Sequence, residues 1–330
     1  MDNFIKMEDP ASVRSAASKL DRLGNSLLDA QAEIGGAARG MDWEGSAKDN
    51  FVQDVDTWGG KMRSLSTRCN EKYYAVLMEV EEWENAAKGF VQGYTPFIKD
   101  PGDSSAVDES DIKQGQIGDC YLMSSMGAIA LQHPELIEKM IRDNGDGTYT
   151  VTFYDAHCLP VGPCTYTPHE VTVDGNPWEK SSRPGDTIGG TQESWTIILE
   201  KAYHKWKEER FLSDPLSILP TPGVALSAMT GKDSVNYPTS AMSMDELYQS
   251  FQRGDAIAAG SQWPANIFRP DEYFGKSDII AEGHVYFITG VDPVNNTVTV
   301  QNPWPDWPPI TMSFEDYQKC FWLTTTNPVV

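Results

Sequence analysis

Apolar residues recur at intervals of three and four along the first 92 residues of the chain. One series ends at glycines 35, 36 and 40, and a second follows, interrupted at Lys72. The first comprises Val13, Ala16, Leu20, Leu23, Leu27, Ala30 and Ile34, and the second Phe51, Val55, Trp58, Met62, Leu65, Cys69, Val76, Val80, Trp83, Ala87 and Phe90. This spacing predicts two amphipathic helices with a heptad seam. Residues 1–94 are therefore expected to form an antiparallel two-helix hairpin, whose flanks suit a helical partner or a second copy.

The pattern changes after the hairpin. Residues 95–112 are rich in Pro, Gly, Ser and Asp and have no apolar period, which indicates a linker. Beyond it, alternating stretches such as TYTVTFYD and HEVTV predict strands, while SWTIILEKAYHKW has the period of a helix. Because strand patterns also dominate the C-terminal third, residues 113–330 are expected to form an α+β domain.

Composition narrows the classes of function. The formal net charge of −22 argues against binding to nucleic acid or to an anionic membrane, since both need clustered Lys and Arg. No stretch approaches the roughly eighteen apolar residues that a membrane span requires. The opening MDNFIKMEDP lacks the apolar core of a secretory signal, so we expect synthesis in the cytoplasm without a cleaved signal peptide.

The cysteines and the absence of metal-binding motifs argue against a disulfide-rich fold and against a metal site. The chain has 5 cysteines, too few for a disulfide scaffold at this length. Cys158 and Cys164 flank the short loop LPVGP and either form a disulfide in an oxidising setting or stay as buried thiols. Cys69 lies in the apolar series and is expected to be a small core residue. No HExxH, paired CxxC or EF-hand loop occurs, so no metal site is predicted and no cofactor is required.

Cys120 is the strongest candidate for chemistry. It lies in QGQIGDCYLMSSM, where the following apolar residues predict a buried helix and Asp119 is placed to cap it. A thiol in the first turn of a helix is favoured as the thiolate by the helix dipole. Gly115 and Gly118 let the preceding loop approach closely, so the Gln114 amide can donate to an oxyanion beside the Cys120 backbone N–H.

A histidine and an asparagine are predicted to meet on a hairpin near the C-terminus. HVYFITGV and TVTVQN predict two strands joined by a turn at residues 292–296. In an antiparallel hairpin, the numbers of two paired residues add up to twice the number of the residue at the centre of the turn. For a turn centred on residue 293, this places His284 and Asn302 opposite one another or nearly so. Asn302 would then orient the imidazole, leaving the other ring nitrogen for Cys120. Trp304 would shield that hydrogen bond from water, although a core role suits it equally.

Together these segments resemble the catalytic domain of calpains, a branch of the papain-like cysteine peptidases. The matching pieces are QGQIGDCYL, LEKAYHKW, TPGVALSAMTGKD, GHVYFITG and QNPWP, in the family's order. The resemblance implies a papain-like fold and endopeptidase activity on protein or peptide substrates. It implies these roles: nucleophile Cys120, general base and acid His284, orienting residue Asn302 and oxyanion donor Gln114. Nothing resembles the calcium-binding tail domains of animal members, so calcium stays open without a motif that indicates it.

Two other functions are consistent with parts of this pattern. A transglutaminase-like acyl transferase also uses cysteine and histidine, but with aspartate third, so Asn302 and Gln114 favour a peptidase. A catalytically silent peptidase fold could act as a protein-binding module, with the hairpin as its functional part. The complete set of candidate catalytic residues argues against that second alternative.

The hairpin itself resembles the small secreted helical hairpins named for their WXG motif. Trp43-Glu44-Gly45 falls in the turn between the two predicted helices. Members of that family are substrates of type VII secretion, and some carry a toxin or enzyme domain behind the hairpin. Their export signal, a tyrosine spaced from an acidic residue, is not matched at Tyr73 or Tyr74. The resemblance implies a secreted effector exported by a type VII-like route; otherwise the protein would remain cytoplasmic.

Overall fold

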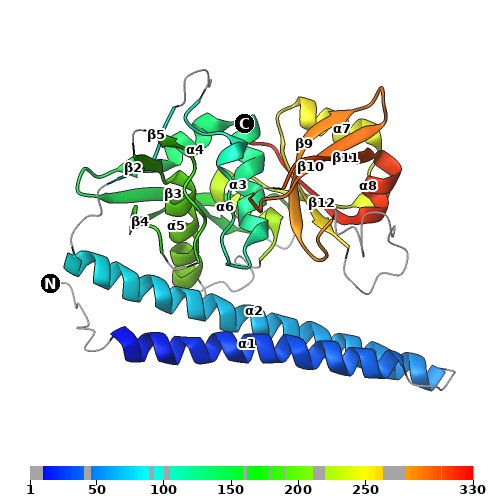
Figure 1. The fold of residues 1–330 in the computed structure, drawn as a ribbon. Helices are drawn as coiled ribbons and strands as arrows, with labels where there is room; N and C mark the ends of the chain where they lie inside the picture. Colours follow the sequence, from blue (N-terminus) through cyan, green and yellow to red (C-terminus); the bar gives the residue numbers. More distant parts are fainter. Residues whose placement is uncertain are drawn as a thin grey trace. The chain divides into compact units, whose positions relative to one another are not determined.

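The chain forms two compact units, Met1–Phe90 and Val91–Val330, which are described separately. The structure is a computed structural model, and it describes residues 10–40, 46–88, 93–99, 105–158, 162–178, 180–188, 190–210, 220–262, 280–305 and 307–329. A helical unit precedes a unit of mixed helices and strands (Figure 1). The predicted α+β class is therefore confirmed. No helix among the described residues combines the length and apolar character needed to cross a membrane.

The first unit is a hairpin of two long helices, α1 (Pro10–Arg39) and α2 (Ser46–Lys88). The helices run antiparallel, because Gly24 of α1 faces Ser66 and Asn70 while Gln31, further along α1, faces Gly59. Of the three glycines expected to end the first helix, Gly35 and Gly36 lie within it, and Gly40 directly follows its last residue, Arg39. Trp43, Glu44 and Gly45, on which the WXG resemblance depends, lie outside the described residues.

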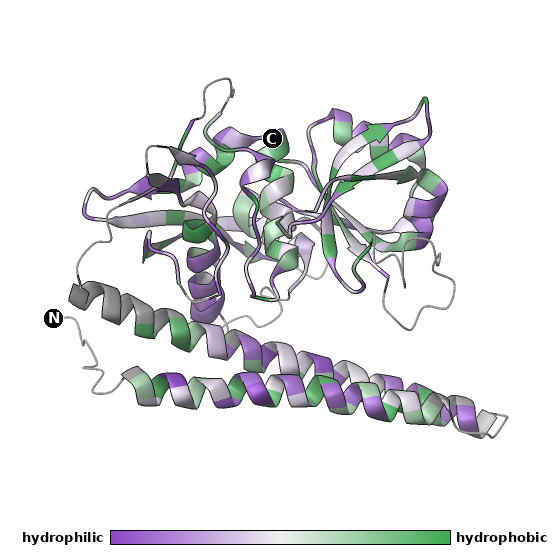
Figure 2. Cartoon of the chain, viewed as in Figure 1, coloured by the Kyte–Doolittle hydropathy of each residue, from purple (hydrophilic) through white to green (hydrophobic). Residues whose placement is uncertain are grey.

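Small residues, rather than the predicted heptad seam, make up the buried face of α1. The buried positions in α1 are Ala17, Gly24, Gly35 and Ala38. A Cβ at Gly24 would lie 2.5 Å from Asn70 Oδ1, so the helices approach too closely there for a larger side chain. The predicted seam is wrong at Leu23, Ile34, Phe51, Trp58 and Leu65, which are all exposed. Figure 2 shows hydrophobic residues recurring along both helices, and the exposed ones place apolar side chains on the surface of the hairpin.

The second unit contains two hydrophobic cores. The first core is surrounded by helices and a three-stranded antiparallel sheet in the order β2-β3-β4. Its elements are α3 (Cys120–Gln132), α4 (Pro134–Met140), β2 (Ile141–Asp143), β3 (Thr148–His157), β4 (Thr165–Asp174), α5 (Trp195–Arg210) and α6 (Pro222–Thr230). The helices at α3 and α5 and the strands β3 and β4 are those that the sequence predicted.

The second core is built on a six-stranded sheet in the order β11-β10-β9-β8-β12-β7. Its elements are β7 (Val235–Pro238), η2 (Thr239–Ala241), α7 (Met244–Gln252), β8 (Ala256–Ser261), β9 (Val285–Asp292), β10 (Thr297–Gln301), β11 (Ile310–Ser313), α8 (Phe314–Cys320) and β12 (Phe321–Asn327). In Figure 1, α3 lies between the β2-β3-β4 sheet and this larger sheet, and the larger sheet includes the predicted hairpin β9–β10.

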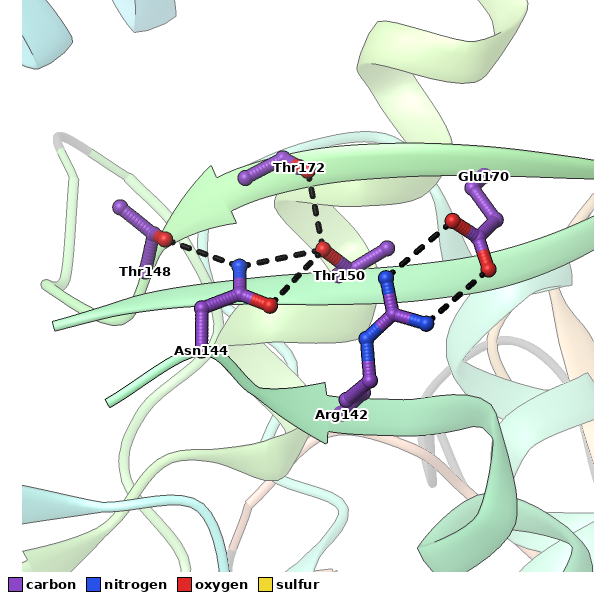
Figure 3. A network of polar contacts seen from close by, with 6 residues as sticks. All are labelled: Arg142, Asn144, Thr148, Thr150, Glu170 and Thr172. Carbon is purple, nitrogen blue, oxygen red and sulfur yellow. Dashed lines mark hydrogen bonds and ion pairs between the residues drawn. The ribbon is translucent and has the colours of Figure 1, made fainter. Parts of the chain in front are cut away.

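The small sheet β2-β3-β4 shows how alternation separates core from surface. Tyr149, Val151 and Phe153 of β3 are buried in the core, and Thr150, which is also buried, lies with Thr152 on the opposite, polar face. On that face Asn144 binds Thr148 and Thr150, and Arg142 makes two hydrogen bonds to Glu170 (Figure 3). Further along the same strands, Cys158 and Cys164 are joined by a disulfide, one of the two alternatives left open by the sequence.

Part of the segment expected to be a linker is built into the second unit. Strand β1 (Tyr94–Thr95) pairs with β6 (Thr191–Glu193), which also pairs with β5 (Thr187–Ile188). The short helix η1 (Glu109–Asp111) has a capping box on Asp108, and Asp111 is buried. These contacts were not expected of residues rich in Pro, Gly, Ser and Asp. They arise because the backbone of the segment pairs with β6 and donates from Ile98 N to Glu193, while Asp111 accepts from Trp195 Nε1.

Candidate active site

Cys120 is the first residue of α3, as predicted, but its surroundings differ from the expectation. Asp119 occupies the N-cap position without making a side-chain capping bond. Its carboxylate instead accepts from Gln114 Nε2 at 3.4 Å and from His204 Nε2 at 3.3 Å. The predicted capping role of the Asp119 side chain is therefore wrong, because these two buried donors take the place of the helix N–H groups.

The start of α3 packs directly against β9. The Cys120 sulfur is in hydrogen-bond contact with the backbone of Val285, the residue after His284. One turn along α3, Ser124 Oγ donates to Val285 O at 2.7 Å. Two points on the helix that begins with Cys120 are thus tied to the residue that follows His284 in the chain.

Burial decides the protonation of both groups. It raises the pKa of the Cys120 thiol to about 12, with a smaller contribution in the same direction from the Asp119 charge. It lowers the pKa of the His284 imidazole to about 4, against the opposing effect of the Asn302 hydrogen bond. Both shifts favour the neutral thiol and the neutral imidazole, so they oppose the effect expected from the helix start.

His284 and Asn302 are in hydrogen-bond contact, with 2.9 Å between His284 Nε2 and Asn302 Oδ1. The predicted register is two residues out. Gln301 pairs with Phe287 after a bulge between Thr299 and Val300, so Asn302 continues opposite Tyr286, and His284 precedes β9. The side chains still meet because diagonal neighbours lie within reach of long side chains.

The tautomer of His284 follows from the partners of Asn302. Asn302 Oδ1 accepts from the backbone N–H of Trp304 at 2.9 Å, while Asn302 Nδ2 donates to Tyr286 Oη at 3.4 Å. This fixes Oδ1 toward the ring, so His284 Nε2 must carry the proton that it donates. Nδ1 is left as the basic nitrogen.

Trp304 covers this pair. Its ring centroid lies 4.4 Å from that of His284, and a second tryptophan, Trp307, packs on it at 5.6 Å. Asn302 and His284 are 1% and 6% exposed, so their hydrogen bond is removed from water. Trp304 itself is half-buried and belongs to neither hydrophobic core, so its position agrees with the shielding role and not with a core role.

Gln114 is held on a loop clamped between the two cores. Its backbone N–H donates to Pro303 O at 2.9 Å, and its Nε2 donates to Ile117 O at 2.8 Å. Gly115 is required here, because a Cβ would lie 1.9 Å from Ser181 O. A pocket of about 310 Å³ adjoins this loop and Trp304.

Several residues around the site were not singled out by sequence. Ser124 ties α3 to β9, and Tyr286 Oη accepts from Ala281 N at 2.8 Å beside Asn302. His204 and Glu200 reach Asp119 from α5. Their signal was the segment LEKAYHKW, which the sequence analysis used only as part of a resemblance.

Three carboxylates gather away from Cys120, in a form that fits a hard cation. Asp111, Asp186 and Glu193 each place an oxygen within 4.8 Å of the others. Asp111 Oδ1 is buried without a hydrogen-bond partner. Gly185 keeps the space beside this oxygen free of a side chain, since a Cβ on residue 185 would lie 2.7 Å from Asp111 Oδ1. Burial raises the pKa of Asp111 to about 6 and that of Glu193 to about 9. An all-oxygen set with an orphaned carboxylate atom suits calcium.

Comparison with known proteins gives one consistent result. Residues 95–309 match the family described as calpain family cysteine protease. The rice protein "Calpain-type cysteine protease ADL1" (Oryza sativa subsp. japonica) is 28% identical over 213 residues, which cover 61% of this chain and 9% of the rice protein. A maize relative, "Calpain-type cysteine protease DEK1" (Zea mays), is 29% identical over 219 residues, 61% of this chain and 9% of its own length.

An animal relative matches over the same extent. Mouse "Calpain-9" (Mus musculus) is 25% identical over 214 residues, covering 59% of this chain and 28% of the mouse protein. The chain thus spans well under a third of each of these relatives. Because the family match covers more than half of the chain and contains the geometry around Cys120, the protein belongs to the calpain family of cysteine proteases.

Proposed function

We propose that the second unit is a cysteine endopeptidase that acts through Cys120, His284 and Asn302. The observation that carries the proposal is the His284–Asn302 hydrogen bond of 2.9 Å, shielded by Trp304 and adjoining the residue that contacts the Cys120 sulfur. An oriented neutral imidazole next to a thiol at a helix start is the arrangement of a base and its nucleophile.

The mechanism begins with a neutral pair. His284 Nδ1 takes the proton from Cys120 as the sulfur attacks the peptide carbonyl carbon, so a C–S bond forms while the carbonyl π electrons move to oxygen. The Gln114 amide and the Cys120 backbone N–H donate to that oxyanion. The carbonyl re-forms, the peptide C–N bond breaks, and His284 gives its proton to the leaving amine. Water activated by His284 then hydrolyses the thioester and restores the thiol.

The alternatives are less well supported by the same geometry. A transglutaminase-like enzyme would place a carboxylate where Asn302 binds His284 Nε2. A silent peptidase fold would have no need to bury and orient the His284 ring beneath Trp304. The enzyme function therefore accounts for contacts that a binding role leaves unexplained.

Calcium fits the Asp111–Asp186–Glu193 cluster as a structural ion. The three residues would hold it through carboxylate oxygens, and its charge would relieve their mutual repulsion. Asp111 belongs to η1, and Glu193 Oε1 accepts from Ile98 N at 2.6 Å. A bound ion would thus fix the segment that precedes the Gln114 loop.

The hairpin is proposed as a delivery and association module. Its support is the exposed apolar set on α1 and α2, including Leu23 at 51% and Trp58 at 63% exposure, which a helical partner or a second copy would cover. With the WXG resemblance of the turn, this arrangement suits a secreted effector carried by a type VII-like route.

Replacing the proposed nucleophile tests the activity. Cys120→Ala should lower the hydrolysis of a fluorogenic peptide library by about a thousandfold or more, since the covalent step is lost. An epoxide inhibitor of thiol peptidases should label the wild-type protein at Cys120 only, as read by peptide mass spectrometry. Cys69→Ala is the matched control and should behave as wild type. A Cys120→Ala variant that keeps full proteolytic activity would contradict the proposal.

The raised pKa of Cys120 predicts how its reactivity changes with pH. A thiol with a pKa of about 12 is protonated throughout the neutral range. The rate of alkylation by iodoacetamide should therefore rise about tenfold per pH unit between pH 7 and 9, as the thiolate fraction grows. The Cys120→Ala variant supplies the background from Cys69. A rate that is high and constant from pH 5 to 8 would instead indicate a thiolate–imidazolium pair.

Calcium should raise the melting temperature of the protein through the carboxylate cluster. At a concentration 100 times the Kd the gain is about 2.7 kcal/mol, which is several degrees in a domain of this size. Asp111→Asn should remove the shift measured by differential scanning calorimetry, whereas exposed Asp146→Asn should keep it. Equal shifts in both variants would contradict this site.

Deleting residues 1–92 separates delivery from catalysis. The shortened protein should be absent from the culture supernatant of the producing cell, because the module that the export route binds is gone. Peptide hydrolysis measured in the cell lysate should be retained. Unchanged amounts in the supernatant would show that the hairpin is not the export module.

A further inference from the structure

The pocket of about 310 Å³ beside Gln114 and Trp304 has no part in the proposed mechanism. Lys180 and Arg183 also line it, and they are the only charged residues among its described lining residues. The chain as a whole has 26 Lys and Arg against 48 Asp and Glu. Two cations around one pocket, without a carboxylate in the described lining, thus run against the charge of the protein, and they favour an anionic ligand.

Backbone hydrogen bonds join the two loops that form this pocket. Gln116 N donates to Lys180 O at 2.9 Å, and Arg183 N donates to Lys113 O at 2.8 Å. Lys180 has a φ of 68°, in the left-handed region that a lysine seldom adopts, and it keeps this conformation where its carbonyl accepts from Gln116. Both cationic side chains therefore extend from a backbone that is already fixed before a ligand binds, which lowers the entropic cost of binding.

Another wall of the pocket is joined to the proposed catalytic groups. Trp304 packs on His284 with 4.4 Å between the ring centroids, and its backbone N–H donates to Asn302 Oδ1 at 2.9 Å. The preceding residue, Pro303, accepts from Gln114 N at 2.9 Å. The pocket is thus built on the same residues that hold the imidazole and the Gln114 loop.

Trp304 relates the pocket to one side of the scissile bond. In the proposed mechanism His284 gives its proton to the leaving amine, so the peptide beyond that amine runs past the His284 ring. Trp304 covers this ring and also lines the pocket. The part of the substrate that follows the scissile bond is therefore the part that comes nearest to Lys180 and Arg183.

We propose that Lys180 and Arg183 form a specificity pocket for an acidic side chain of the substrate, an Asp or Glu that follows the scissile bond on the leaving-amine side. The inference rests on the proposed peptidase function and names a substrate class for it. An arginine binds a carboxylate through two N–H groups, and Lys180 adds a second positive charge. A neutral or basic side chain at the same position gains neither interaction, so the pocket discriminates by charge.

Pairs of peptides measure this preference. Each is a fluorescence-quenched peptide with an amidated C-terminus, and the two members of a pair differ by Glu against Gln at one of the three positions after the scissile bond, which mass spectrometry locates. At one of these positions the wild-type protein should cleave the Glu peptide with a kcat/KM about tenfold higher, mainly through a lower KM. The same exchange before the scissile bond should change kcat/KM by less than about twofold.

Substitutions of the two cations show whether they cause the preference. The ratio of kcat/KM between the Glu and Gln peptides is taken within each variant, so that a change in the folded fraction cancels. Arg183→Gln and Lys180→Gln should each lower this ratio, and the double variant should bring it to about one. Arg183→Glu should invert it, because a carboxylate there repels the acidic peptide. Arg142→Gln, which removes an exposed arginine of β2, is the matched control and should keep the wild-type ratio.

Two results would overturn the inference alone. One is a wild-type ratio near one at all three positions, and the other is a wild-type preference that persists in the double variant of Lys180 and Arg183. In both cases, cleavage of the Gln peptide by the wild-type protein and its loss in Cys120→Ala would leave the proposed function standing. A wild-type protein that cleaves no peptide of the set would overturn the proposed function together with the inference.

Discussion

The close packing of α3 against β9 is the constraint on which the rest of the site depends. Gly127 makes it possible, because a Cβ there would lie 2.7 Å from the ring of Phe287, a fully buried residue that has no room to move. Ser124 Oγ adds a hydrogen bond to Val285 O at 2.7 Å. The helix carries Cys120 and the strand follows His284, so a helix held farther away would separate nucleophile and base. The short sequence SSMG in α3 therefore matters as much as the cysteine itself.

The same burial that builds the site controls its protonation. Trp304 covers His284, and Cys120, which is half-buried, lies against the start of β9, and burial shifts the pKa of each group toward the neutral form. A neutral resting pair does not prevent catalysis, since proton transfer can accompany attack on the carbonyl. The negative charge that forms on the carbonyl oxygen during attack must then be stabilised by the oxyanion donors. The orientation of Gln114 is accordingly more important here than in a site that begins as an ion pair.

Much of this arrangement could be predicted from the sequence, and the failures have identifiable causes. Periodicity located α3, α5, β3, β4, β9 and β10, because each has a strong apolar repeat. The hairpin rule brought His284 near Asn302 but missed the register, because the turn is centred between Val294 and Asn295 instead of on Pro293, and the bulge at Thr299 and Val300 corrects only one residue of that difference. In α1 the rule for large apolar residues failed, because glycine and alanine allow closer packing than leucine.

The two buried carboxyl pairs could not be predicted, because their partners are far apart in sequence, and they resolve the same electrostatic problem differently. Asp119 accepts from Gln114 and His204 while Glu200 accepts from Ser182 N, and burial together with the charge of Asp119 raises the pKa of Glu200. Asp111 and Glu193 have a third carboxylate, Asp186, whose oxygen lies within 4.8 Å of theirs, and burial raises the pKa of both. The third carboxylate gives this cluster the oxygen ligands that a hard cation prefers, which the Asp119–Glu200 pair does not offer.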